Sequence, residues 1–278
     1  ATTISATTIS GGTLYGDGSN LTGISAPSGI FGIPNTSGVY TFYSTLTSAM
    51  SAAISGQTIE LFSDITESGS TAVIMKSGVS LNGNGHTYTF TPTTTNVHTF
   101  ADTGATNFNF YNITVKRTGA QTGGGILGLN NASSIINGFA TYFVVETPSS
   151  FGITNSGSSV FAAAVSGFDV RSNVATSQCV NLIRGSITNC RFISNSTTGS
   201  VYLNLTTISD CYIQCSSSGY VLSLQNSAIG YRCTCIANTG VGVTGGIINN
   251  SYIYSSGNYG VSGITAVSYT HLRAHETL

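Results

Sequence analysis

Short stretches in which apolar and polar residues alternate recur along the second half of the chain. Each stretch is eight residues long, and turns rich in Gly, Ser, Thr and Asn separate it from the next. Their first residues are 20 to 22 residues apart, and such a regular period indicates a repeat architecture. The stretches read VSGFDVRS, ITNCRFIS, ISDCYIQC, AIGYRCTC and INNSYIYS, and they begin at Val165, Ile187, Ile208, Ala228 and Ile248.

The fourth, sixth and eighth places of these stretches form three columns. Alternation with a period of two places all three columns on one face of a strand. Short strands stacked in register, rung upon rung, are typical of a parallel β-helix, whereas a leucine-rich repeat needs a leucine consensus that is missing here. The columns are Phe168, Cys190, Cys211, Tyr231 and Ser251; Val170, Phe192, Ile213, Cys233 and Ile253; and Ser172, Ser194, Cys215, Cys235 and Ser255.

The repeat loosens upstream of the regular rungs at residues 165–260. Two more rung strands are predicted at Phe110–Arg117 and Ile136–Phe143, with longer loops between them. Residues 44–55 predict a helix with Ser44 as N-cap and Gly56 as C-cap. Because a solenoid must cover its first rung, this helix is expected to be the N-terminal cap. Its apolar face consists of Leu46, Met50, Ala53 and Ile54.

The composition agrees with a folded β-rich chain and excludes some classes of function. Charged residues make up 6% of the 278 residues and hydrophobic ones 40%, so the chain carries enough apolar surface to fold. The formal net charge of -1 offers no basic surface for nucleic acid. No apolar run is long enough to cross a bilayer. We therefore expect neither nucleic-acid binding nor membrane insertion.

Two motifs near the predicted helix resemble the N-terminal cap and first rungs of the pectin-lyase-like, right-handed β-helix superfamily. The resemblance implies an all-β, right-handed parallel β-helix with a short capping helix, and it specifies architecture rather than activity. The first motif, G-x-T-I-x-L, is matched by Gly56, Thr58, Ile59 and Leu61; the second is matched by Gly78, Val79, Leu81, Gly83, Gly85 and His86.

The start of the chain is similar to shaft segments of bacteriophage tail fibres. It repeats the pentapeptide ATTIS and continues with LYGDGSNLTGIS at Leu14–Ser25. Similar segments also occur in bacterial surface proteins. The resemblance implies an extended shaft or linker at residues 1–38, followed by a β-helix at 39–266. It further implies a homotrimer located in the virion, with an extracellular or bacterial cell-surface location as the alternative.

Carboxylates are too sparse in the rungs to predict an active site. Between Phe110 and Ala266 they are Glu146, Asp169 and Asp210, and the last two are expected to point in different directions, two rungs apart. We predict no catalytic residues, no metal ligands and no cofactor. Two alternatives stay open: a site assembled across subunits, and one built from carboxylates near the cap, which are Glu60, Asp64 and Glu67.

The cysteines are interpreted as core residues. Cys190 and Cys211 share one inward column, and Cys215 and Cys235 share another. Small buried thiols stacked between rungs account for this arrangement. A zinc site or a disulfide is the alternative.

The fifth and seventh places of the stretches point outward and combine aromatic rings with guanidinium groups. Such residues suit sugar stacking and hydrogen bonding, but they are equally favoured at contacts between subunits. We expect this stripe to contact a carbohydrate or a protein partner. Its residues are Asp169, Arg171, Arg191, Tyr212, Gln214, Arg232, Tyr252 and Tyr254.

The last residues depart from the rest of the chain. Val267–Thr277 reads VSYTHLRAHET and resembles the translation of a transposase sequencing adapter. The rung pattern is expected to stop before it, with no column residue in register. We therefore treat residues 267–278 as an artefactual tail, either poorly packed or paired by chance with the last rung. The natural chain is then expected to continue beyond Ala266.

These observations lead to one main hypothesis and two alternatives. The main hypothesis is a noncatalytic receptor-binding or structural module of a phage-like tail fibre that contacts a surface polysaccharide or glycan of the host. The first alternative is a polysaccharide depolymerase, a lyase or hydrolase of tailspike type, with its catalytic groups in the loops of residues 90–165. The second is a bacterial β-helical adhesin.

Overall fold

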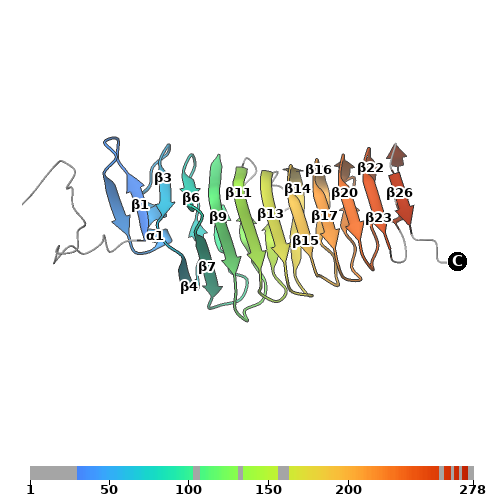
Figure 1. The fold of residues 1–278 in the computed structure, drawn as a ribbon, viewed down its shortest axis with the longest axis horizontal. Helices are drawn as coiled ribbons and strands as arrows, with labels where there is room; N and C mark the ends of the chain where they lie inside the picture. The colour runs from blue at the N-terminus through green and yellow to red at the C-terminus, as the bar shows by residue number, and fades with distance from the viewer. Residues whose placement is uncertain are drawn as a thin grey trace, which may run out of the picture.

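The chain forms a rod of stacked rungs that runs from the N-terminal to the C-terminal end (Figure 1). The structure is a computed structural model, and it describes residues 30–102, 107–130, 134–155, 163–256, 260–263, 266–268 and 271–274. Neighbouring rungs are joined by parallel strand pairing. The predicted all-β parallel β-helix is therefore confirmed. The expected shaft at residues 1–38 lies largely outside the described residues.

Each rung contributes strands to three parallel sheets, which we call faces A, B and C. Face A contains β5 (Val73–Ile74), β8 (Phe100–Asp102), β10 (Gly125–Leu129), β12 (Phe151–Asn155), the first parts of β14 (Gln178–Thr188) and β16 (Val201–Ser209), β18 (Leu222–Gln225), β21 (Val243–Thr244) and β24 (Val261–Ser262).

Face B follows in chain order. It contains β3 (Thr58–Leu61), β6 (Ser80–Asn82), the first parts of β9 (Phe108–Arg117), β11 (Ile135–Val145) and β13 (Ala163–Ser172), the second parts of β14 and β16, β19 (Ile229–Tyr231), β22 (Ile247–Asn249) and β25 (Ala266–Ser268).

Face C completes each rung. It contains β4 (Ile65–Gly69), β7 (Thr87–Pro92), the second parts of β9, β11 and β13, β15 (Arg191–Ser194), β17 (Tyr212–Cys215), β20 (Thr234–Ala237), β23 (Tyr252–Ser255) and β26 (His271–Ala274).

A column of residues with left-handed backbone turns the chain from face B to face C. A positive φ is uncommon outside glycine, and Asn and Asp tolerate it best among the other residues. Asn189, Asp210 and Asn250 occupy this corner. The column, with its φ angles, is Asn112 (44°), Ala140 (49°), Gly167 (79°), Asn189 (53°), Asp210 (56°), Arg232 (47°) and Asn250 (48°).

The predicted register is wrong for one rung, the one that contains the fourth stretch. The residue paired with Ile208 is Gly230, so the fourth stretch begins two residues later than Ala228. Arg232 consequently lies at the corner and Cys233, not Tyr231, enters the first column. This rung is longer than expected at the corner between faces A and B, where both Asn226 and Ser227 have positive φ.

The N-terminal end of the rod is covered by a hairpin and a helix. Strands β1 (Phe31–Pro34) and β2 (Tyr40–Tyr43) pair antiparallel, and β1 also pairs with β3, so the folded body begins before the predicted boundary at residue 38. The helix α1 spans Leu46–Ala52, shorter than the predicted 44–55. It contacts β1, β2 and β5, as expected of a cap.

Both ends of α1 differ from the predicted ones. At its start Thr45, rather than Ser44, is the N-cap, and the Leu46 N–H donates to Glu67 Oε1 at 2.9 Å. Ala53, the C-cap, already has extended backbone, which ends the helix before Gly56. Leu46, Met50 and Ala53 are buried as predicted, whereas Ile54 is 65% exposed because it lies beyond the last helical turn.

The core changes character along the rod. In the N-terminal half, buried aromatic rings contact one another in an unbroken run, from Phe31 through Tyr88, Phe100, Phe110 and Phe143 to Phe168. Beyond Phe168 the same inward column continues with Cys190, Cys211, Cys233 and Ser251, all buried. In this column the rungs beyond β13 therefore carry smaller side chains.

Face B becomes shorter between β11 and β13. Asn137 pairs with Ser166, but the next pair is Thr141 with Phe168, so β11 carries two residues more than β13 at this corner. The backbones of β11 and β13 approach closely here, and a Cβ atom added to Gly167 would overlap the carbonyl oxygen of Gly138. This step separates the wide rungs up to β11 from the narrower ones that follow.

The C-terminal segment corrects a prediction. Its backbone continues the ladder, since Val267 pairs with Ile248 and Leu272 with Ile253. Column residues are thus in register where none was expected, because the hydrophobic spacing of this segment fits one further rung. Two outcomes were anticipated for the tail, poor packing or chance pairing with the last rung, and in the structure it pairs with the last rung. The resemblance to an adapter stays a prediction.

Candidate functional site

The outward residues predicted to form one stripe fall into separate groups. Asp169, Arg191 and Tyr212 lie side by side in one column of face C. Arg171 and Gln214 belong to the neighbouring outward column, with Ile193 between them. The first column also includes Tyr142, because this residue pairs with Asp169.

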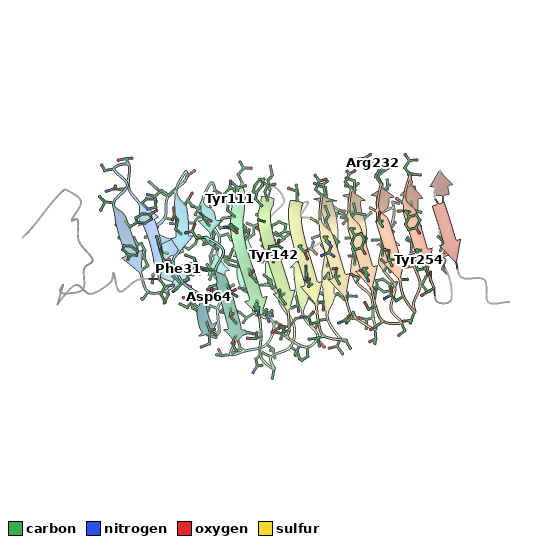
Figure 2. All side chains as sticks on the ribbon, in the orientation of Figure 1. Phe31, Asp64, Tyr111, Tyr142, Arg232 and Tyr254 are labelled. Atoms are coloured by element: carbon green, nitrogen blue, oxygen red, sulfur yellow. The ribbon has the colours of Figure 1, made fainter. Side chains whose placement is uncertain are left out.

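The other three residues lie elsewhere. Arg232 is at the corner and not on the strand, since Tyr212 pairs with Thr234. Tyr252 and Tyr254 follow one rung later, beside Thr234 and Ile236. Figure 2 labels Tyr142, Arg232 and Tyr254 at successive positions along the rod. The predicted continuous stripe is therefore interrupted at β20.

Asp169 is the centre of a network of charged side chains. Arg171 donates from Nε and Nη2 to its two carboxylate oxygens at 3.1 and 3.2 Å, and Arg191 donates from Nη1 at 3.0 Å. The Asp169 side chain is 16% exposed, while both arginines are nearly half exposed. The carboxylate thus holds two guanidinium groups in fixed positions, and each keeps donors directed toward solvent.

Asp169 and Arg191 line a shallow groove of about 470 Å³ at the corner between faces B and C. Tyr142 and Tyr212 lie in its wall, and the Arg191 guanidinium carbon lies 5.4 Å from the centre of the Tyr212 ring, in cation–π contact. The groove begins at the step between β11 and β13, where Ala140 and Gly167 line it. Asp169 and Asp210 both line it too and lie two rungs apart, as predicted.

Tyr142 is the site residue that sequence reasoning missed. It is 42% exposed and follows the alternation of β11, in which Thr141 and Phe143 are buried. That alternation was visible in the sequence, but the two additional residues of β11 hid its register with Asp169.

Asp210, which lines the groove, forms a tight ion pair with Arg232. Arg232 donates from Nε and Nη2 to the two oxygens of Asp210, both at 2.7 Å, although its own backbone is left-handed. This bidentate contact lowers the pKa of Asp210 below its ordinary value of 3.8. A carboxyl group with a lowered pKa stays ionised at neutral pH.

We expect Arg232→Gln to raise the pKa of Asp210 back toward its ordinary value, because the charge-assisted hydrogen bonds that favour the ionised form are lost. In the unchanged protein the pair stabilises the fold above pH 3.8 and loses this effect as the pH falls through the lowered pKa. Carbon-detected NMR titration of the Asp210 carboxyl group measures both values. Arg171→Gln, which removes a partner of Asp169, serves as control and should leave Asp210 unchanged.

The cysteines lie in the core as predicted, with one correction. Within the described residues all six are buried and have free thiols. Cys190 and Cys211 share an inward column, but Cys215 pairs with Ala237, and Cys235 pairs with Ile213 because the fourth stretch is shifted. In the part of the chain that the structure describes, no three His, Cys, Asp or Glu side chains are arranged to hold a metal ion.

The carboxylates near the cap are divided between two faces. Glu67 accepts from the start of α1 and from the Tyr88 hydroxyl, so its contacts are structural. Glu60 lies on face B, on β3. Asp64 accepts from the Thr87 N–H at 2.8 Å and lies 3.3 Å from His86 Nδ1. No common site joins the three.

Comparison of the sequence with protein-family models finds no matching family, and comparison with curated proteins finds no matching relative. Among the helices of the described residues, none is long and apolar enough to cross a membrane. The resemblance to the pectin-lyase-like superfamily consequently remains a proposal, carried by the cap motifs quoted above.

Proposed function

We propose that the protein is a noncatalytic, glycan-binding module that uses the groove between faces B and C. The observation that supports this most is the grouping of Tyr142, Asp169, Arg191 and Tyr212 in one column. Aromatic rings contact the apolar faces of sugars, and paired charged groups hydrogen-bond to their hydroxyl or carboxylate groups. Strands of successive rungs are about 4.8 Å apart, so an extended polysaccharide lying along the rod meets an ordered row of side chains.

The resemblance of the first residues to tail-fibre shafts supports the location that we propose. In such a protein the β-helix is the receptor-binding part of a homotrimeric virion fibre, and its ligand is a surface polysaccharide of the host. A bacterial β-helical adhesin would use the same groove in the same way.

A polysaccharide depolymerase is the second candidate, because two carboxylates line the groove. Asp169 and Asp210 are two rungs apart, which separates their strands by about 10 Å and is comparable to the acid–base spacing of inverting glycosidases. However, a general acid needs a raised pKa, and the pKa of Asp210 is lowered by Arg232. Asp169 is held by two arginines. This pairing favours binding over catalysis.

Binding of the purified protein to a panel of bacterial surface polysaccharides tests the proposal. We expect saturable binding without release of oligosaccharides, and about tenfold weaker binding for Arg191→Ala and for Tyr212→Ala, since each removes a central contact of the groove. Thr234→Ala, an outward change in the same column one rung further, is the matched control.

Two results would count against the proposal. Release of reducing ends that disappears in Asp169→Asn or Asp210→Asn would establish the depolymerase instead. Equal binding by Arg191→Ala, Tyr212→Ala and the unchanged protein would exclude the groove. Light scattering of the purified protein tests the homotrimer separately.

A further inference from the structure

A second row of outward residues crosses the wide rungs on face B and ends at Phe139, next to the groove residue Ala140. Strand pairing places these residues side by side across β2, β1, β3, β6, β9 and β11, which stand next to one another along the rod (Figure 1). At about 4.8 Å per strand the row is about 24 Å long. We call it the face B strip, and it consists of Phe42, Gly32, Glu60, Asn82, Tyr111 and Phe139.

Aromatic rings lie at both ends of the face B strip. At one end Tyr40, Phe42 and Phe62 surround Gly32; their ring centres are 5.2 to 5.8 Å apart, and a Cβ atom on Gly32 would come within 2.8 Å of two of the rings. At the other end Tyr111 and Phe139 are stacked, with centres 5.1 Å apart and planes inclined by 11°. Phe62 is 42% and Phe139 53% exposed.

The middle of the strip is polar. Asn82 donates to Asn84 Oδ1 at 2.9 Å, and Asn84 donates to Glu60 Oε2 at 3.3 Å. Tyr40 hydrogen-bonds to Glu60, which raises the pKa of this phenol. These contacts orient two amides and a carboxylate between the aromatic ends, so the strip alternates from apolar to polar and back to apolar.

Large exposed aromatic rings are costly to keep in water and mark places of contact. A face between subunits would need apolar residues in the middle as well, whereas here that part offers amide and carboxylate groups. Pyranose rings present C–H faces to aromatic side chains and hydroxyl groups to such polar groups. Because no Lys or Arg belongs to the strip, nothing in it would neutralise an acidic sugar.

We propose that the face B strip binds an uncharged oligosaccharide of several pyranose units, laid along the rod. The two aromatic ends stack on sugar units, and Glu60, Asn82 and Asn84 accept or donate hydrogen bonds to the hydroxyl groups between them. This site goes beyond the groove at the corner between faces B and C, differs from it in charge, and does not require it. Tyr111 lies closer to the N-terminal end of the rod than Tyr142 (Figure 2).

Isothermal titration calorimetry of the full chain with maltohexaose, cellohexaose and an oligogalacturonate tests this site. We expect saturable binding of an uncharged hexaose and no binding of the oligogalacturonate at the strip. Phe62→Ala and Phe139→Ala should each weaken binding about tenfold, because one stacking platform is removed. Tyr231→Ala is the matched control, since Tyr231 is an outward, 37% exposed aromatic residue of face B further along the rod.

The variants also separate this proposal from the function proposed for the groove. Arg191→Ala should retain the binding of the uncharged hexaose, and a loss confined to that variant would place the ligand in the groove and refute the strip. Absence of saturable binding by both uncharged hexaoses would refute it as well. So would a lower oligomeric state of Phe139→Ala in light scattering, because the strip would then be covered by a second copy of the chain.

Discussion

Replacing Gly167 with alanine is expected to lower the free energy of unfolding by about 3 kcal/mol. Gly167 has a φ of 79°, where any other residue is strained, and its added Cβ atom would overlap the Gly138 carbonyl oxygen of the preceding rung. The backbone oxygen cannot move aside without disturbing the step between β11 and β13. Urea denaturation followed by circular dichroism measures the change.

Gly85→Ala is the matched control for this prediction. Gly85 lies at the same corner with a φ of 86°, but an added Cβ atom would meet no atom within 4 Å. Gly85→Ala should therefore lower the free energy of unfolding by only about 1 kcal/mol, the cost of a left-handed backbone at alanine. Equal losses for the two variants would contradict the steric explanation.

Phe110→Ala is expected to cost about 4 kcal/mol of unfolding free energy. The Phe110 ring is fully buried, and its centre lies 4.9 to 5.9 Å from those of Phe100, Phe108, Phe143 and Phe168. Its removal would leave a cavity that side chains from several rungs cannot fill, and it would interrupt the aromatic run. Chemical denaturation monitored by tyrosine fluorescence provides the measurement.

The comparison for Phe110 is Phe139→Ala, on the next strand but outside the core. As a change of an exposed side chain it should alter the unfolding free energy by about 0.5 kcal/mol or less. If both phenylalanine variants unfolded at the same urea concentration, the aromatic run would not be the stabilising element that its burial implies.

The architecture could be predicted because a period of about twenty residues and strict alternation leave few alternatives. The register could not be predicted throughout, because turns between faces vary in length. Two positive-φ residues at Asn226 and Ser227 lengthen one rung and move Arg232 to the corner. A left-handed backbone at an arginine is not expected from the sequence. The bidentate partner of Arg232, Asp210, belongs to the preceding rung, so the pairing is visible only once the register is known.

The charge of a residue does not by itself predict whether its side chain points outward or into the core. Arg117 ends a strand that was correctly predicted, yet its side chain is fully buried, and it donates from Nη2 to the Gly123 carbonyl at 2.8 Å. The alternation of β9 places it inward, opposite Phe90 and Val145. The sequence predicted an outward stripe, and three of its residues, Asp169, Arg191 and Tyr212, are neighbours. Placing Tyr142 beside them required the register that the step in face B conceals.

The buried cysteines make local opening of the rod measurable. Burial raises the pKa of Cys233 to about 11 and that of Cys179 to about 12, so both thiols are protected from alkylating reagents while the rungs are closed. In a stacked fold the rungs can open from an end. The cysteines lie in three successive rungs, with Cys179 and Cys190 in the first, Cys211 and Cys215 in the second, and Cys233 and Cys235 in the third. The order in which the cysteines become labelled would therefore record the direction in which the rod unravels.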